Sequence, residues 1–324
     1  MAETRYVKAV TRALEDAMRA DPRVILIGED VASAGGSFKA TRGLLDTFGP
    51  DRVHDAPIAE AAITGIAVGA ALSGLRPVAE IMFMDFMTLS MDMLVNQAAK
   101  ARYMFGGQGS VPMVLRTPHG GGLSAGPQHS QCLEAWLAHV PGLKVVVPAT
   151  VEDAYALLRA AIDDPDPVIV VENKALYALK GDLPDQPAPA RIGQAIIRRP
   201  GDDVTLVTYG ATLWTALRAA EVARTRGVSV EVIDLRSVQP WDEAAVLASL
   251  ARTHRLMIVH EAVEAFGVGA EIAARMADIG FDELDAPIIR VAAPFSPIPF
   301  SPALEKAWAP DDTRILAAID RLMA

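Results

Sequence analysis

Two side chains between residues 55 and 92 have types that suit chemistry on a flat, nitrogen-containing ring. Glu60 stands near the start of an expected apolar helix, residues 58–75, that is rich in Gly and Ala. Phe86 lies in a methionine-rich run shortly after the strand expected around residues 78–84. A carboxylate can hydrogen-bond a ring nitrogen, and an aromatic side chain can stack on the ring face. The pattern therefore indicates a site for a heteroaromatic cofactor.

Both residues also have ordinary structural explanations. An acid in the first turn of a helix is favoured by the helix dipole alone, and we expect Asp55 to cap this helix with Pro57 in its first turn. A phenylalanine is by default a core residue. Residue types alone do not choose between these readings.

A Gly-rich loop at residues 119–131 carries two motifs typical of esterases. His119 is followed by three glycines, and Gly122-Leu-Ser-Ala-Gly126 has the form of a nucleophile elbow around Ser124. In esterases these motifs come from different strand–helix junctions, whereas here they share a glycine and no strand leads directly into the serine. A serine hydrolase is therefore only an alternative. His129 in the same loop is either a general acid/base or an ordinary loop residue.

Other common motifs are absent or incomplete in the sequence. Gly267-Val-Gly269 lacks the third small residue of a dinucleotide-binding fingerprint and fits a close-packed turn. No phosphate-binding P-loop motif occurs, and the histidines do not show metal-ligand spacing.

The chain alternates apolar strands with amphipathic helices, which favours parallel sheets covered on both faces. We predict an α/β fold of two three-layer αβα domains with mainly parallel sheets, residues 1–180 and 201–324. A proline-rich stretch at residues 181–200 is predicted to be the linker.

Composition limits the possible partners and location. A chain of 324 residues with a formal charge of −10 is not expected to bind nucleic acid or anionic membrane. The N-terminal residues do not resemble a targeting signal, and no apolar run reaches the length of a membrane span. The single cysteine, Cys132, fits a reducing compartment, so we expect a cytoplasmic protein.

Nearly the whole chain resembles the β subunit of the thiamine-diphosphate-dependent 2-oxo acid dehydrogenases, the heterotetrameric first component of pyruvate, acetoin and branched-chain complexes. The resemblance is carried by ILIGEDV, AEAAITGIAVGAALSGLRPVAEIMF, QHSQCLEAWLAHVPGLKVVVPA and VEVIDLRSVQPWD. It implies a transketolase-like pyrimidine-binding domain followed by a transketolase C-terminal-like domain.

The resemblance also implies roles for single residues. Glu60 matches the glutamate that hydrogen-bonds the aminopyrimidine ring, and Phe86 matches the aromatic that stacks on it, with Ile58 and Met82 lining the same slot. Glu29 matches an acid behind Glu60. His129 matches a histidine that handles reaction intermediates and transfer to the lipoyl group.

A loop at Ala161, Ile162 and Asp164 matches a structural K⁺ site in relatives, although Asp166 replaces a common amide there. The Gly-Asp-Gly motif that holds the diphosphate and Mg²⁺ in the wider family is absent from this sequence. The resemblance therefore implies half an active site, with Mg²⁺ held by an α subunit in an α₂β₂ heterotetramer. It further implies a dihydrolipoyl acyltransferase partner, which binds through its subunit-binding and lipoyl domains.

The substrate is not fixed by the sequence. The segments RYMFGG and AGPQHSQ favour a pyruvate or acetoin enzyme, and a branched-chain 2-oxo acid dehydrogenase is the alternative. A non-catalytic assembly module with a decayed cofactor groove is a second alternative, from a different functional class.

Overall fold

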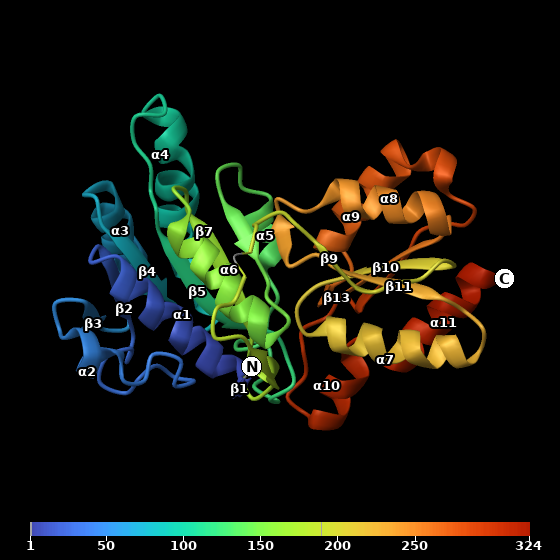
Figure 1. Ribbon diagram of the computed structural model, residues 1–324, viewed down its shortest axis with the longest axis horizontal. Coiled ribbons are helices and arrows are strands. Elements are labelled where there is room, and N and C mark those ends of the chain that lie inside the picture. Colours follow the sequence, from blue (N-terminus) through green and yellow to red (C-terminus); the bar gives the residue numbers. More distant parts are fainter. Residues whose placement is uncertain (1, 189) are drawn as a thin grey trace. The chain divides into compact units, whose positions relative to one another are not determined.

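The computed structural model describes residues 2–188 and 190–324, which form two compact units (Figure 1). Unit 1 comprises the chain up to His119 together with Trp136–Ile192, and unit 2 comprises Gly120–Ala135 together with Gly193–Ala324. The segment Gly120–Ala135 thus belongs to the second unit, although it lies between strands of the first in the sequence.

Six parallel strands of unit 1 pair in the order β6-β7-β5-β4-β2-β3. Their bounds are β2 Val24–Gly28, β3 Val53–Asp55, β4 Arg76–Glu80, β5 Val114–His119, β6 Lys144–Val146 and β7 Val168–Asn173. All residues of β2, β5 and β7 are buried, as expected for parallel strands covered on both faces.

Helices α1 (Tyr6–Ala20), α3 (Glu60–Leu72) and α6 (Val151–Asp163) pack on this sheet, and α1 also contacts α6. The remaining elements are β1 Ala2–Arg5, α2 Leu44–Phe48, the 3₁₀ helix η1 Met84–Ser90, the π-helix η2 Met93–Ala98, α4 Ala99–Met104, η3 Lys174–Leu176 and β8 Lys180–Leu183. The short helix α5, Glu134–Ala138, crosses the boundary between the units.

The apolar helix is shorter than predicted, and its predicted cap is wrong. Helix α3 begins at Glu60, and the residue before it, Ala59, offers no side-chain cap. Asp55 ends strand β3, and its carboxylate accepts hydrogen bonds from the N–H groups of Ala32 (2.7 Å) and Ser33 (3.0 Å). Asp55 therefore anchors the loop after β2 rather than the helix.

The sheet of unit 2 has the order β14-β13-β10-β11-β9. Four strands are parallel, β10 Val204–Thr208, β11 Val230–Asp234, β13 Leu256–Val263 and β14 Ile289–Ala293, and β9 Ile196–Arg199 is an antiparallel edge. Figure 1 shows α7 and α11 on one side of this sheet and α8 and α9 on the other. The other bounds are α7 Thr212–Thr225, β12 Ser237–Gln239, α8 Glu243–Thr253, α9 Val268–Ile279, η4 Phe281–Glu283, α10 Pro302–Trp308 and α11 Asp312–Met323.

The stretch predicted to be a linker, residues 181–200, carries a strand at each end. Strand β8 pairs antiparallel with β1, and β9 pairs antiparallel with β11. The described residues from 184 to 195 contain no helix or strand. Edge strands are defined by backbone pairing and need no alternating apolar pattern, so no local pattern of residues marked them.

Candidate functional site

Two buried carboxylates, Glu29 and Glu60, form the centre of the predicted site in unit 1. Glu29 follows β2 and is 7% exposed, and Glu60 opens α3 and is 5% exposed. The Ser90 hydroxyl donates to the Glu60 carbonyl oxygen (3.0 Å) and accepts from the Thr64 hydroxyl (2.7 Å). These bonds hold the first turn of α3 against η1.

Glu29 has a raised pKa. Burial, followed by the negative charges of Glu60 and Asp30, raises the pKa of Glu29. One of its carboxylate oxygens, Oε1, is buried and has no hydrogen-bond partner among the described residues. The two buried carboxylates therefore lie close enough for the charge of Glu60 to act on Glu29, and the Glu60 carboxylate is available to a ring nitrogen.

Phe86 belongs to an aromatic cluster that the sequence did not indicate. The Phe86 ring lies edge-on to Phe83 (centroids 5.8 Å apart), and Phe83 is likewise edge-on to Phe38 (5.8 Å). Phe38 in turn contacts Tyr177 at 4.9 Å. The cluster joins η1 to the loop after β2 and to the chain after η3, with Phe86 half-buried at its end.

A buried ion network ends at the same cluster. The Arg116 guanidinium donates to both carboxylate oxygens of Glu172 (2.8 Å each) and to Glu80 (2.7 Å). The Tyr177 hydroxyl donates to Glu172 (2.7 Å). Burial lowers the pKa of Arg116, but the charges of Glu172 and Glu80 outweigh burial and raise it overall. Arg116 is therefore a permanent cation that fixes the carboxyl ends of β4 and β7 and, through Tyr177, the aromatic cluster.

Ile58 and Met82 flank these groups in the chain. Ile58 precedes α3 and is 83% exposed, whereas Met82 follows β4 and is half-buried. Glu29, Glu60, Met82 and Phe86 all lie in unit 1, at or just beyond the carboxyl ends of parallel strands or on the following helix, where ligands bind in open α/β sheets.

His129 lies in unit 2, on the Gly-rich loop. Its backbone N–H donates to the carbonyl of Gly126 (3.2 Å), and the side chain is half-buried. This loop does not serve as an esterase site. The Ser124 hydroxyl and the N–H groups of Gly122 and Ser124 are bonded to the Glu305 carboxylate, so the groups that a hydrolase would use are already engaged.

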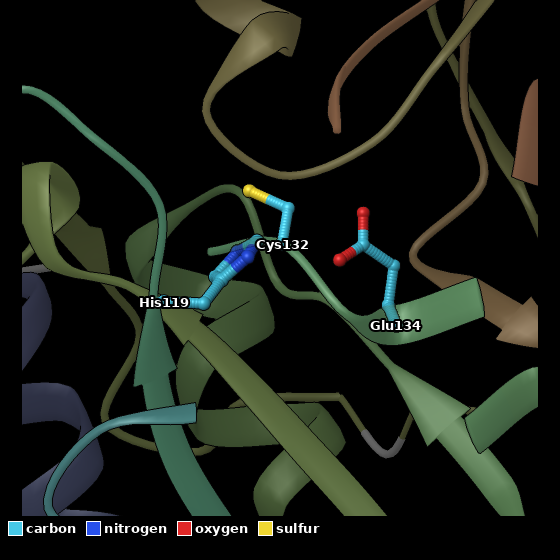
Figure 2. A group of neighbouring side chains, drawn as sticks. All are labelled: His119, Cys132 and Glu134. Carbon is cyan, nitrogen blue, oxygen red and sulfur yellow. The ribbon is translucent and has the colours of Figure 1, made fainter. Parts of the chain in front are cut away.

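A third buried carboxylate follows the same loop. Figure 2 shows Glu134 at the start of α5, with Cys132 two residues before it. The Tyr209 hydroxyl donates to Glu134 (2.8 Å), and the Tyr209 ring stacks near His260 (centroids 6.0 Å apart). Burial, and secondarily the charge of Glu261, raises the pKa of Glu134 to about 7, although the Tyr209 hydrogen bond lowers it.

The glycines of the incomplete dinucleotide motif are required by packing. A Cβ on Gly267 would lie 2.7 Å from the Val263 carbonyl oxygen, and one on Gly269 would lie 2.7 Å from the His260 Nε2. The close-packed turn predicted for this motif is confirmed.

The predicted K⁺ loop is already occupied by side-chain cations. The carbonyl oxygens of Ile162 and Asp164 accept from the Arg76 guanidinium (2.7 and 3.2 Å), and the Asp164 carboxylate pairs with Lys144 (2.7 Å). The carbonyl of Ala161 accepts from the Asp164 N–H (3.3 Å). A metal cation here would meet two fixed positive charges, so these oxygens do not fit a K⁺ site, and that prediction is withdrawn.

In the part of the chain that the structure describes, no helix combines the length and apolarity needed to cross a bilayer.

Comparison with known proteins identifies both units. Residues 2–180 match the pyrimidine-binding domain of transketolase, and residues 193–315 match the transketolase C-terminal domain. A solved split-gene transketolase, an inactive β4 tetramer, superposes with a TM-score of 0.82 over 98% of each chain at 20% identity, which shows the fold.

Three relatives are each 46% identical. They are the pyruvate dehydrogenase E1 component subunit beta-2 of Oryza sativa (97% of this chain, 85% of the relative), the acetoin:2,6-dichlorophenolindophenol oxidoreductase subunit beta of Bacillus subtilis (97% and 96%) and the 3-methyl-2-oxobutanoate dehydrogenase subunit beta of Mycobacterium tuberculosis (98% and 91%). The chain therefore belongs to the family of β subunits of the 2-oxo acid dehydrogenase E1 component.

Proposed function

We propose that this chain is the β half of an α₂β₂ dehydrogenase that decarboxylates a 2-oxo acid on thiamine diphosphate and transfers the acyl group to the lipoyl group of a dihydrolipoyl acyltransferase. The observation that carries the proposal is the buried Glu29–Glu60 pair at the carboxyl edge of the sheet, in the same unit as the half-buried Phe86. We also propose a cytoplasmic location, because Cys132 is the single cysteine of the sequence and fits a reducing compartment.

The residues of unit 1 fit the pyrimidine half of the cofactor. Glu60 supplies a carboxylate for a ring nitrogen, Phe86 a face for the ring, and Met82 and Ile58 apolar surface beside it. When bound, thiamine diphosphate supplies the nucleophilic carbon that attacks the 2-oxo group. The role of this chain is to hold a proton at the Glu60 carboxylate, with Glu29 behind it opposing full ionisation of the pair.

The diphosphate and Mg²⁺ are assigned to the α subunit, because this chain has no Gly-Asp-Gly motif. Calorimetric titration of the isolated chain with thiamine diphosphate and Mg²⁺ should show no tight binding, and addition of the α chain should restore it. Micromolar binding by the isolated chain would contradict the shared site.

The test of the chemical role is Glu60→Gln in the assembled enzyme. The amide keeps the size and one hydrogen bond but cannot hold the shared proton, so kcat should fall by about 10²–10⁴-fold. The matched control is Glu152→Gln, which removes an exposed first-turn acid from α6 and should leave kcat unchanged. Equal, near-normal turnover in both variants would mean that Glu60 only stabilises the start of α3. It would support the alternative that this chain is a non-catalytic assembly module.

Pyruvate or acetoin is the proposed substrate type, on the strength of RYMFGG and AGPQHSQ. Equal identity to pyruvate, acetoin and branched-chain relatives does not separate these choices. The enzyme co-purified with its α subunit should be assayed with pyruvate, acetoin, 2-oxobutyrate and branched 2-oxo acids and an artificial electron acceptor. Highest kcat/KM for a branched acid would contradict the proposal.

A further inference from the structure

We propose that Glu261 and Glu305, here called the carboxylate clamp, are positioning residues for acyl transfer, because they fix the loop that carries His129. The role in transfer rests on the proposed function, whereas the clamp itself rests on contacts within unit 2. Neither residue was singled out by the sequence, since they lie 132 to 176 positions beyond His129.

Glu305 alone engages three donors of the loop. Its carboxylate accepts from the N–H of Gly122 (2.9 Å), the N–H of Ser124 (3.0 Å) and the Ser124 hydroxyl (3.0 Å). Glu261, on β13, accepts from the N–H of Gly121. Three backbone amides within four residues are thus tied to two carboxylates from α10 and β13.

The backbone of the loop is shaped for this purpose. Positive φ angles occur at alternate positions, Gly120 (83°), Gly122 (92°), Ser124 (52°) and Gly126 (78°). Residues in left-handed conformation interspersed along a chain can turn successive N–H groups toward one side, which creates an anion-binding concavity. The anion that fills it here is the protein's own Glu305.

These donors satisfy a buried carboxylate. Glu305 is 6% exposed, and it forms no ion pair with any residue that the structure describes. A buried carboxylate without a cation is costly unless hydrogen bonds satisfy its oxygens. Loss of the loop contacts would leave the buried oxygens of Glu305 without these hydrogen-bond donors. The bound position of the loop is therefore strongly preferred.

Packing against Ile298 and Phe300 also restricts the loop. A Cβ on Gly121 would lie 2.8 Å from Ile298 Cδ1, and one on Gly126 would lie 2.1 Å from the Phe300 ring. The Gly126 carbonyl accepts from the His129 N–H, so the constraint extends to the histidine. The position of the His129 backbone is thereby tied to the segment that carries Glu305.

The first test needs no catalysis. In Glu305→Gln, an amide NH₂ replaces an oxygen that accepts N–H groups, so hydrogen exchange of the amides of Gly122 and Ser124 should accelerate by about 10–100-fold. Glu271→Gln, an exposed acid on α9, is the control and should exchange like the parent. Parent-like exchange in folded Glu305→Gln would overturn the clamp, whatever the function of the protein.

The second test uses the assembled enzyme. Two rates are compared in Glu305→Gln, reductive acylation of a lipoyl domain and turnover with an artificial electron acceptor. The loss in the acylation rate should be at least ten-fold larger than the loss in turnover, because small displacements of a reacting group are costly. In a His129→Ala background, Glu305→Gln should cause no further loss of acylation. Equal losses in both assays, or additive losses with His129→Ala, would overturn the positioning role while leaving the exchange result intact. A parent enzyme without acylation activity would instead overturn the proposed function.

Discussion

Two regions of the molecule, the Arg116 network of unit 1 and the Gly120–Ala135 segment of unit 2, bury acidic side chains in different ways. In unit 1, Glu80 and Glu172 lie against the Arg116 guanidinium, a permanent cation. In unit 2, Glu305 is bonded to backbone N–H groups and a hydroxyl, and Glu134 to the Tyr209 hydroxyl. Burial raises the pKa of Glu80, although the Arg116 charge lowers it. Glu134 has a hydroxyl donor in place of a guanidinium, and burial raises its pKa to about 7. The Arg116 network is therefore expected to respond chiefly to loss of its cation, and Glu134 to loss of its hydroxyl donor or to a change of pH.

The largest effect is expected for Arg116→Met. Removing the cation leaves two buried carboxylates uncompensated, which should lower the free energy of unfolding by about 3–5 kcal/mol. The measurement is the denaturant midpoint of the full chain. As a control, the triple variant that also carries Glu80→Leu and Glu172→Leu should recover much of the loss, because a buried ion network can be replaced by apolar side chains. A small loss in the single variant would mean that Glu80 and Glu172 tolerate burial without the Arg116 cation.

The second effect is a pH dependence that belongs to Glu134. Its pKa is about 7 in the folded chain against an ordinary 4.5, so between these values the folded chain holds a proton that the unfolded chain has released. Stability should therefore fall as the pH rises through this window and then level off. At pH 8, Glu134→Gln should be more stable than the parent by about 3 kcal/mol, since one pKa unit corresponds to about 1.4 kcal/mol.

Burial of His260 acts in the opposite direction. It lowers the pKa of His260 to about 4, so that stability falls as the pH drops below 6.5. This contribution is common to parent and variant and cancels in their difference. Tryptophan fluorescence suits the measurement, because Trp214, Trp241 and Trp308 lie in unit 2. Parallel stability curves for parent and Glu134→Gln would show that Glu134 does not take up a proton on folding.

The smallest effect comes from a matched pair of hydroxyl deletions. Tyr177→Phe removes a donor from Glu172, which is ion-paired with Arg116, and should cost about 1.5–3 kcal/mol. Tyr209→Phe removes a donor from Glu134, which below pH 7 is largely protonated, and should cost about 0.5–1.5 kcal/mol at pH 6. Denaturant midpoints at pH 6 measure both. A larger loss for Tyr209→Phe would reverse the contrast between the units.

Much of the fold followed from local patterns. Continuous apolar runs such as Val24–Gly28 and Val168–Asn173 became fully buried parallel strands, and the alternation of strands with helices produced a mainly parallel sheet in each unit. Glu60 at the start of an apolar helix was likewise visible from the residues alone. These features depend on residues that are close together in the sequence, because the periods of strands and helices indicate which positions face a core.

The groups that support the site were decided by tertiary structure. The Phe38–Phe83–Tyr177 cluster, the Arg116 network and the carboxylate clamp join residues that are 36 to 183 positions apart, and no local period marks such partners. Distance along the sequence also explains why the carbonyls of the predicted K⁺ loop do not fit a K⁺ site. The guanidinium that donates to the carbonyls of Ile162 and Asp164 belongs to Arg76 on β4. Distance along the sequence likewise explains why Gly120–Ala135 joined unit 2, because its N–H groups find their acceptors on β13 and α10. The sequence determined which apolar residues of the strands and helices would face a core, and the topology of the chain decided which buried charges and donors would meet.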